Sequence, residues 1–234
     1  MKSILEQNQI MTRRLDDLQT HNLFIYQDPQ KYCFTSDAVH LANFVTTPKN
    51  AKVVDLCSGT GVIGILVCVK NPVDIVKMVE IQDDVAQMSR DSVKYNNLQD
   101  KIEIVASPLQ NVHKIIGTEK YDVVVCNPPY KKSQASMLSE NDSIKIAKHE
   151  IKMVLEDVFV EASKLLKYGG SLYLINKEER LSDMICFGRK YNLEAKQIVV
   201  IESKKGANVV MVRCVKGGKS GIVLSRIDSD KKYC

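Results

Sequence analysis

A polar residue, two prolines and an aromatic ring, Asn127-Pro128-Pro129-Tyr130, follow an apolar run over residues 121–126 that predicts a buried strand. The Asn127 amide offers a carbonyl acceptor, and the rigid proline pair leaves the Pro128 carbonyl as a second acceptor held in a set direction. A planar amino group between these acceptors would use both hydrogens and expose its nitrogen lone pair. Tyr130 offers a face on which a heteroaromatic ring can stack. The four residues therefore predict activation of a planar amine towards an electrophile such as a sulfonium methyl, with no metal; the alternative is a proline-punctuated strand end.

A second candidate is the glycine-rich turn Asp55-Leu-Cys-Ser-Gly-Thr-Gly61, which follows an apolar run over residues 52–56 and opens a helical pattern. Gly59 and Gly61 let the backbone adopt positive φ and pass close to a ligand. The spacing matches neither the dinucleotide-binding fingerprint nor the P-loop. Asp55 would repel a pyrophosphate but accept hydrogen bonds from an ammonium or a hydroxyl. This combination favours a cofactor that carries an amino acid moiety over NAD or ATP; the alternative is a purely structural turn.

Glu80 stands at the end of the next strand pattern, 19 residues after Gly61. A carboxylate at this place in an α/β sheet can accept hydrogen bonds from both hydroxyls of a ribose. The alternative is a surface acid that ends a strand. Because the turn and the acid fall in consecutive strand–helix units, we interpret them as one cofactor site.

The elements that must position these residues alternate along the chain. Strands are expected over 52–56, 74–81, 101–106, 121–126, 171–175, 196–202 and 208–215, and helices over 37–45, 61–70, 83–95, 109–116, 152–167 and 178–191. Alternation of strands and helices predicts a parallel, doubly wound α/β sheet. Only five residues separate the last two strands, which forces an antiparallel hairpin. We therefore expect a seven-stranded, mostly parallel sheet over residues 49–217, with an N-terminal extension over 1–48 that contributes to the cofactor site and a tail over 218–234.

Composition agrees with one globular domain of 234 residues, with 44% hydrophobic and 26% charged residues. No apolar stretch is long enough to span a membrane, and the N-terminus has no signal-peptide core. The seven cysteines form no CxxC pair and lie mostly in apolar runs, which favours reduced thiols in the cytoplasm over a zinc site or a disulfide framework. Residues 177–234 carry 13 Lys/Arg against 7 Asp/Glu, while the rest of the chain is nearly neutral. A basic C-terminal third suggests an anionic partner, although solvated lysines explain it equally well.

These motifs together resemble the class I S-adenosyl-L-methionine-dependent methyltransferases, with DLCSGTG as cofactor loop and NPPY as the motif of enzymes that methylate planar nitrogens. The resemblance covers about residues 30–217 and implies a Rossmann-like fold. It also implies that Ser58, beside the two glycines of the loop, and Asn127 contact the cofactor. NPPY is shared by DNA and RNA adenine-N6, guanine-N2 and glutamine methyltransferases. It is therefore specific for the reaction type and not for the substrate.

Other stretches are similar to the tRNA(Val) adenine-N6 methyltransferases, which modify the adenosine 3′ to the anticodon. Residues 34–42 (FTSDAVHLA) resemble that family's segment before the cofactor loop, which implies that Thr35 and Asp37 close over the methionine end of the cofactor. Residues 147–150 (AKHE), 178–181 (EERL) and 204–208 (KKGAN) also fit that family's pattern. The resemblance implies tRNA, at its anticodon loop, as the partner. The sequence does not determine the oligomeric state, and a monomer is compatible with it.

Basic residues after the catalytic motif suit a loop that orders on RNA, where phosphate contacts make binding salt-dependent. We expect substrate contacts from Tyr130, Lys131, Lys132, Lys148, His149, Lys204 and Lys205. For His149 a purely structural role at a helix start is the alternative, because the attacking amine sheds its proton only after methyl transfer. For the lysines of residues 131–148, the alternative to RNA binding is a flexible surface loop.

This chain departs from the pattern of the resembled family at the residue expected to contact the adenine of the cofactor. Members of the resembled family place an acid after the third strand, whereas this chain has Ser107 in the segment 105–110 (VASPLQ). Ser107, a backbone carbonyl or Gln110 must then contact the adenine amino group, or the contact is lost. The open functional alternatives are guanine-N2 methylation of rRNA, glutamine-N5 methylation of a release factor, and a cofactor-binding RNA module without turnover.

Overall fold

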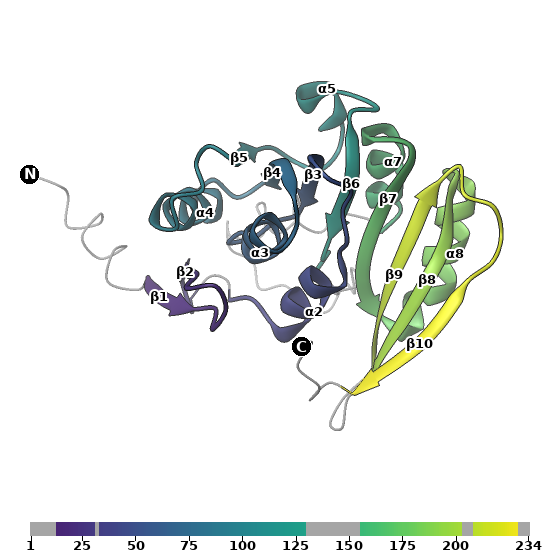
Figure 1. The fold of residues 1–234 in the computed structure, drawn as a ribbon, viewed down its shortest axis with the longest axis horizontal. Helices are drawn as coiled ribbons and strands as arrows, with labels where there is room; N and C mark the ends of the chain where they lie inside the picture. Colours follow the sequence, from purple (N-terminus) through teal and green to yellow (C-terminus); the bar gives the residue numbers. More distant parts are fainter. Residues whose placement is uncertain (1–12, 31–32, 130–154, 203–207, 229–234) are drawn as a thin grey trace, which may run out of the picture.

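The computed structural model describes residues 13–30, 33–129, 155–202 and 208–228. An eight-stranded sheet with the order β10-β8-β9-β7-β6-β3-β4-β5 forms the centre of the described chain (Figure 1). The strands are β3 (Ala51–Leu56), β4 (Val73–Glu80), β5 (Ile102–Ala106), β6 (Tyr121–Cys126), β7 (Leu166–Lys177), β8 (Leu193–Glu202), β9 (Val209–Lys216) and β10 (Val223–Asp228). No helix among the described residues is both long and apolar enough to cross a membrane.

The sheet is covered on both faces, which explains why its central strands are apolar at successive positions. In β3, Val53 packs with the cluster on one face and Val54 with the cluster on the other. The first face carries α2 (Ser36–Phe44) and α3 (Val62–Lys70), together with Val93 of α4 (Asp83–Tyr95). The second face carries α5 (His113–Ile116), α7 (Leu155–Leu165) and α8 (Leu181–Lys190), the last preceded by the short 3-10 helix η1 (Glu178–Arg180). The predicted doubly wound α/β fold is confirmed.

Strand directions place the predicted site residues at one edge. Strands β3, β4, β5, β6 and β7 are parallel, and β3 has β4 on one side and β6 on the other. The strand order therefore reverses between β3 and β6, and ligands of open α/β sheets bind outside the carboxyl ends of the strands at such a point. The expected antiparallel hairpin is present, since β9 is antiparallel to both β8 and β7.

The structure differs from the expected elements in three places. Residues 223–228, within the expected tail, form β10, which pairs in parallel with β8 and raises the strand number from the expected seven to eight. Strand β7 begins at Leu166, so α7 ends at Leu165 and not at residue 167. The helix expected over 109–116 is reduced to the single turn of α5. In the first two cases a long-range strand pairing overrides the local pattern.

The N-terminal extension adds a small element beside the first face. Strands β1 (Arg14–Asp17) and β2 (Phe24–Gln27) form an antiparallel pair. The Tyr26 N–H donates to Ser92 Oγ of α4 at 2.9 Å, and Asn96 Nδ2 donates to the Phe24 carbonyl. Leu23, Ile25 and α2 belong to the core of the first face. The extension therefore packs on the sheet domain and shares its core.

Candidate active site

The glycine-rich turn connects β3 to α3 in a conformation that requires several left-handed residues. Cys57, Gly59 and Gly61 have φ of 57°, 56° and 93°. The Ser58 N–H donates to the Val79 carbonyl at 3.0 Å, and the Gly61 N–H donates to the Ser58 carbonyl at 2.9 Å. Glycine is also required at residue 61 for space, because a Cβ there would lie 2.9 Å from Met78 Cε. The turn is therefore a compact loop fastened to β4.

Glu80 is buried at the carboxyl end of β4 and holds this turn in place. Its Oε2 accepts a hydrogen bond from the Gly59 N–H at 2.9 Å, and its Oε1 accepts one from the Gln82 N–H at 2.9 Å. An ionised carboxylate has about four lone-pair directions, so both oxygens can accept further hydrogen bonds. The position is compatible with the predicted contact to two ribose hydroxyls. It also gives Glu80 a structural task that the sequence did not reveal.

Asp55 is fully buried at the end of β3. Its Oδ2 accepts a hydrogen bond from the Gly64 N–H of α3 at 2.9 Å, and its Oδ1 has no hydrogen-bond partner among the described residues. Burial raises the pKa of Asp55 to about 8; the Gly64 N–H opposes the rise and the nearby Glu80 carboxylate adds to it. A buried acid with an unused oxygen is suited to a ligand that brings a donor or a positive charge.

Asn127 meets the glycine-rich turn because β3 and β6 are neighbours. Their register pairs Leu56 with Cys126, so the next residues of both strands emerge side by side. A narrow pocket at this place is lined by Phe34, Ala38, Cys57, Ser58, Thr60, Val62, Ile63 and Asn127. Two buried hydroxyl oxygens of its wall, Ser58 Oγ and Thr60 Oγ1, have no hydrogen-bond partner among the described residues. The pocket thus combines the amide predicted to hold an amine with two unsatisfied hydroxyls, that of Ser58, which is predicted to contact the cofactor, and that of Thr60.

Ser107 and Gln110 lie on the loop after β5. The Ser107 N–H donates to the Glu80 carbonyl at 3.0 Å, which places this residue beside the carboxyl end of β4. Its hydroxyl donates to the Pro108 carbonyl at 3.0 Å. Gln110 Nε2 donates to Asp157 Oδ2 of α7 at 2.9 Å, which ties the loop to the second face. Of the two predicted adenine contacts, Ser107 is the one held next to the Glu80 strand end.

Most of the predicted cofactor residues are brought together by the fold. Asp55, Ser58, Gly59, Gly61, Glu80, Ser107 and Asn127 all lie at the carboxyl ends of β3, β4, β5 and β6. Thr35 is the N-cap of α2, and Asp37 lies in its first turn. Their neighbours Phe34 and Ala38 line the pocket, so the start of α2 borders the site. The assignment of Thr35 and Asp37 to the cofactor stays a prediction.

On the amine side, Pro128 is buried and Pro129 is exposed after the end of β6. The other predicted substrate residues lie outside the described part of the chain: Tyr130, Lys131, Lys132, Lys148, His149, Lys204 and Lys205. The loop that contains the last two connects β8 to β9. Because β8 is parallel to β7, the carboxyl end of β8 lies at the same edge of the sheet as Asn127.

Besides apolar residues of the pocket lining, three residues of the site with a hydroxyl or thiol side chain were not predicted. Thr60 and Cys57 line the pocket, and Ser89 of α4 donates from its hydroxyl to the Gly59 carbonyl at 2.7 Å. Thr60 could have been found as a second hydroxyl within the glycine-rich turn. No sequence signal marks Ser89, because its contact joins residues 30 positions apart.

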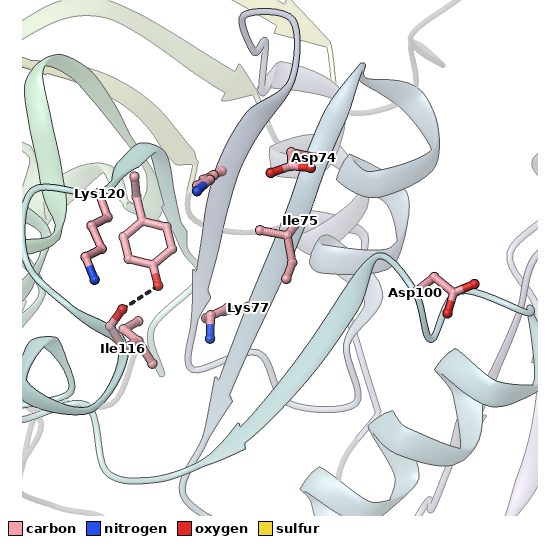
Figure 2. Close-up of a pocket in the computed structure, with 8 residues that line it drawn as sticks. Asp74, Ile75, Lys77, Asp100, Ile116 and Lys120 are labelled. Carbon is pink, nitrogen blue, oxygen red and sulfur yellow. Dashed lines mark hydrogen bonds between the residues drawn. The ribbon is translucent and has the colours of Figure 1, made fainter.

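A larger hollow lies at the opposite edge of the sheet (Figure 2). Its volume is about 390 Å³, and it is lined by residues of β3, β4 and β6, by the end of α5 and by the segments before β5 and β6: Lys52, Asp74, Ile75, Lys77, Asp100, Ile116, Lys120 and Tyr121. The Tyr121 hydroxyl donates to the Ile116 carbonyl at 2.9 Å, and Lys77 pairs with Glu103 at 2.7 Å. None of the predicted site residues lines this hollow. We therefore assign the candidate active site to the smaller pocket at the carboxyl edge.

Comparisons with known proteins bear on the fold and the family of this chain. The structure of a predicted O-methyltransferase from Agrobacterium tumefaciens is similar, with a TM-score of 0.63 at 19% identity over 83% of this chain and 89% of that one. The fold is thus that of the class I methyltransferases. Residues 36–201 match the family model of the methyltransferase small domain, and the chain belongs to this family.

Two curated relatives carry names that state different substrates. A tRNA1(Val) (adenine(37)-N6)-methyltransferase of Porphyromonas gingivalis is 28% identical over 152 residues, which are 64% of this chain and 59% of that protein. The chain thus matches about three-fifths of the length of this relative. A ribosomal protein uL3 glutamine methyltransferase of Bordetella pertussis is 34% identical over 98 residues, 42% of this chain and 32% of that protein.

Proposed function

We propose that this chain is an S-adenosyl-L-methionine-dependent methyltransferase that modifies the exocyclic N6 of an adenosine in tRNA, next to the anticodon of a valine tRNA. The observation that carries the proposal is the pocket in which Asn127 lies beside the turn of Ser58 and Thr60. The name of the Porphyromonas gingivalis relative supports the choice of substrate. We place the activity in the cytoplasm, where such a substrate is available.

The residues present fit the cofactor. S-adenosyl-L-methionine, when bound, supplies an electrophilic methyl group on a sulfonium sulfur. Asp55 would accept from its amino group, and Glu80 would accept from the ribose hydroxyls while it keeps its bonds to the turn. Ser58 and Thr60 offer hydroxyls that lack a partner among the described residues, and Ser107 borders the place for the adenine. Positive φ at Gly59 and Gly61 lets the backbone approach without a side chain in the way.

The amine side follows from the geometry of the β6 end. Asn127 Oδ1 and the Pro128 carbonyl would accept the two hydrogens of the adenine amino group and direct its lone pair towards the cofactor. Tyr130 would stack on the base. A base in the anticodon loop is unpaired, so it can be splayed out without opening a duplex.

Mass spectrometry of tRNA nucleosides tests the proposal. Cells with the protein should contain more N6-methyladenosine in tRNA than cells without it, and Asn127→Ala should abolish the difference. Titration of purified Asn127→Ala with S-adenosylhomocysteine should show nearly unchanged affinity, because the turn and Glu80 remain. Full activity of Asn127→Ala would refute the mechanism, and unchanged N6-methyladenosine would refute the substrate.

Glutamine-N5 methylation of a protein is the second candidate, because the Bordetella pertussis relative is named a ribosomal protein uL3 glutamine methyltransferase. A glutamine amide is also a planar nitrogen that the Asn127 and Pro128 acceptors could hold. Peptide mass spectrometry of ribosomal proteins and release factors from the same two cell lines separates the candidates. A methylated glutamine that depends on the protein, with unchanged tRNA, would select this second candidate.

A further inference from the structure

Asp55 is the acid of the site whose hydrogen bonding is least complete. Its side chain has no exposed surface, one oxygen accepts from the Gly64 N–H at 2.9 Å, and the other oxygen has no partner within the described part of the chain. A fully buried carboxylate with a single hydrogen bond is strongly disfavoured relative to the neutral acid. The geometry therefore favours a proton on Asp55 as long as no ligand is bound.

Within the described part of the chain, the groups that face this carboxyl give it no positive charge. From β4 it faces the Glu80 carboxylate, and from the end of β6 the thiol of Cys126, which contacts Cys57 in turn. Its register partners in β4 and β6 are the uncharged Met78 and Val125. Helix α3 contributes only the Gly64 N–H. Every titratable group in this set is an acid, so the surroundings also favour the proton on Asp55.

We propose that Asp55 is a neutral carboxylic acid in the ligand-free protein and loses its proton when the ammonium group of the cofactor enters the turn, so that cofactor binding releases one proton. This inference rests on the proposed function. The O–H bond of Asp55 breaks, its proton passes to the buffer, and the ammonium keeps its three hydrogens. The resulting carboxylate oxygen then accepts a charge-assisted hydrogen bond from the ammonium.

The number of protons released on binding follows from the raised pKa of the buried acid. Because burial raises the pKa of Asp55 to about 8, about nine-tenths of the molecules carry the proton at pH 7. Binding of S-adenosylhomocysteine, whose amino group is already protonated at pH 7, should therefore release about 0.9 proton at this pH. The apparent Kd should fall about 50-fold from pH 6 to pH 8 and then level off.

Isothermal titration calorimetry of the purified protein with S-adenosylhomocysteine, in two buffers of different ionisation enthalpy, measures this release directly. 5′-Methylthioadenosine is the matched ligand, because it keeps the adenine and ribose but lacks the ammonium; its binding should release no proton. Asp55→Asn should bind S-adenosylhomocysteine without proton release and with an affinity that hardly changes between pH 6 and pH 8. Asp74→Asn, an exposed acid at the opposite edge, is the control that should behave as the wild type.

The outcomes separate the two proposals. Tight binding of S-adenosylhomocysteine to the wild type without proton release would overturn the inference and leave the proposed function intact. Equal release with 5′-methylthioadenosine would also overturn it, because the ammonium would not be the trigger. Release that persists in Asp55→Asn would assign the proton to another group. Absence of any binding of S-adenosylhomocysteine would refute the proposed function itself.

Discussion

Replacement of Gly61 by alanine tests whether the glycine-rich turn is a ligand site or only a connection. Gly61 has φ of 93°, and the added Cβ would lie 2.9 Å from Met78 Cε and 3.4 Å from Ser89 Oγ. A non-glycine residue in the left-handed region costs about 1–2 kcal/mol. Met78 is fully buried, so moving its terminal methyl adds about 1 kcal/mol of overpacking. We expect Gly61→Ala to lower the free energy of unfolding by about 2–3 kcal/mol.

Gly169→Ala is the matched control. Gly169 also has a positive φ, of 80°, but nothing lies within 4 Å of its added Cβ, and it precedes the buried part of β7, far from the carboxyl edge. This variant should lose only the backbone cost of about 1–2 kcal/mol. The difference between the two variants, about 1 kcal/mol, then measures the crowding against Met78.

Urea unfolding gives the two stability losses, and calorimetry with S-adenosylhomocysteine gives the affinities. Gly61→Ala should weaken binding by about tenfold or more, since a displaced turn misplaces its backbone and hydroxyl groups by fractions of an ångström. Gly169→Ala should bind as the wild type. Equal affinities of the two variants would refute the assignment of the turn to the cofactor, and equal stability losses would refute the packing argument.

Three further predictions concern single side chains. Glu80→Gln should lower the free energy of unfolding by about 2 kcal/mol, because its amide NH2 would face the N–H of Gly59 or of Gln82; an unchanged urea midpoint would contradict this. Because the pKa of Asp55 is raised, only the folded state holds its proton between pH 3.8 and about 8, so the ligand-free wild type should lose stability relative to Asp55→Asn as pH rises through this interval. Urea unfolding at a series of pH values should show a widening difference between the unfolding free energies of the two proteins, and a constant difference would contradict the prediction. Tyr130→Ala should lower kcat/KM for tRNA by about tenfold or more while Tyr130→Phe changes it little, because the ring and not the hydroxyl stacks on the base; equal losses in steady-state assays would oppose this role.

The sequence by itself determined the class of fold and the edge of the sheet where the candidate site lies. Apolar runs of five to eight residues alternating with helical patterns leave few topologies, and the five-residue gap before the last strand permits only a hairpin. Parallel strands end at one edge, so Asp55, Glu80 and Asn127 had to lie near one another once each was assigned to a strand end. These are local patterns combined with general rules of chain connection, and neither requires the packing of the finished molecule.

The tertiary structure decided what these side chains do within the site. Glu80 holds the Gly59 N–H across 21 positions of sequence, and no local pattern encodes such a bond. The unused oxygen of Asp55 and its raised pKa depend on burial beneath α3 and on the proximity of Glu80, which exist only after the layers have packed. The pairing of β10 with β8 likewise joins a segment that reads as a tail to the edge of the sheet. Hydrogen bonds, desolvation and strand pairing between distant segments are properties of the folded arrangement. For this reason sequence patterns indicated a candidate site, while only the structure supplied its electrostatics.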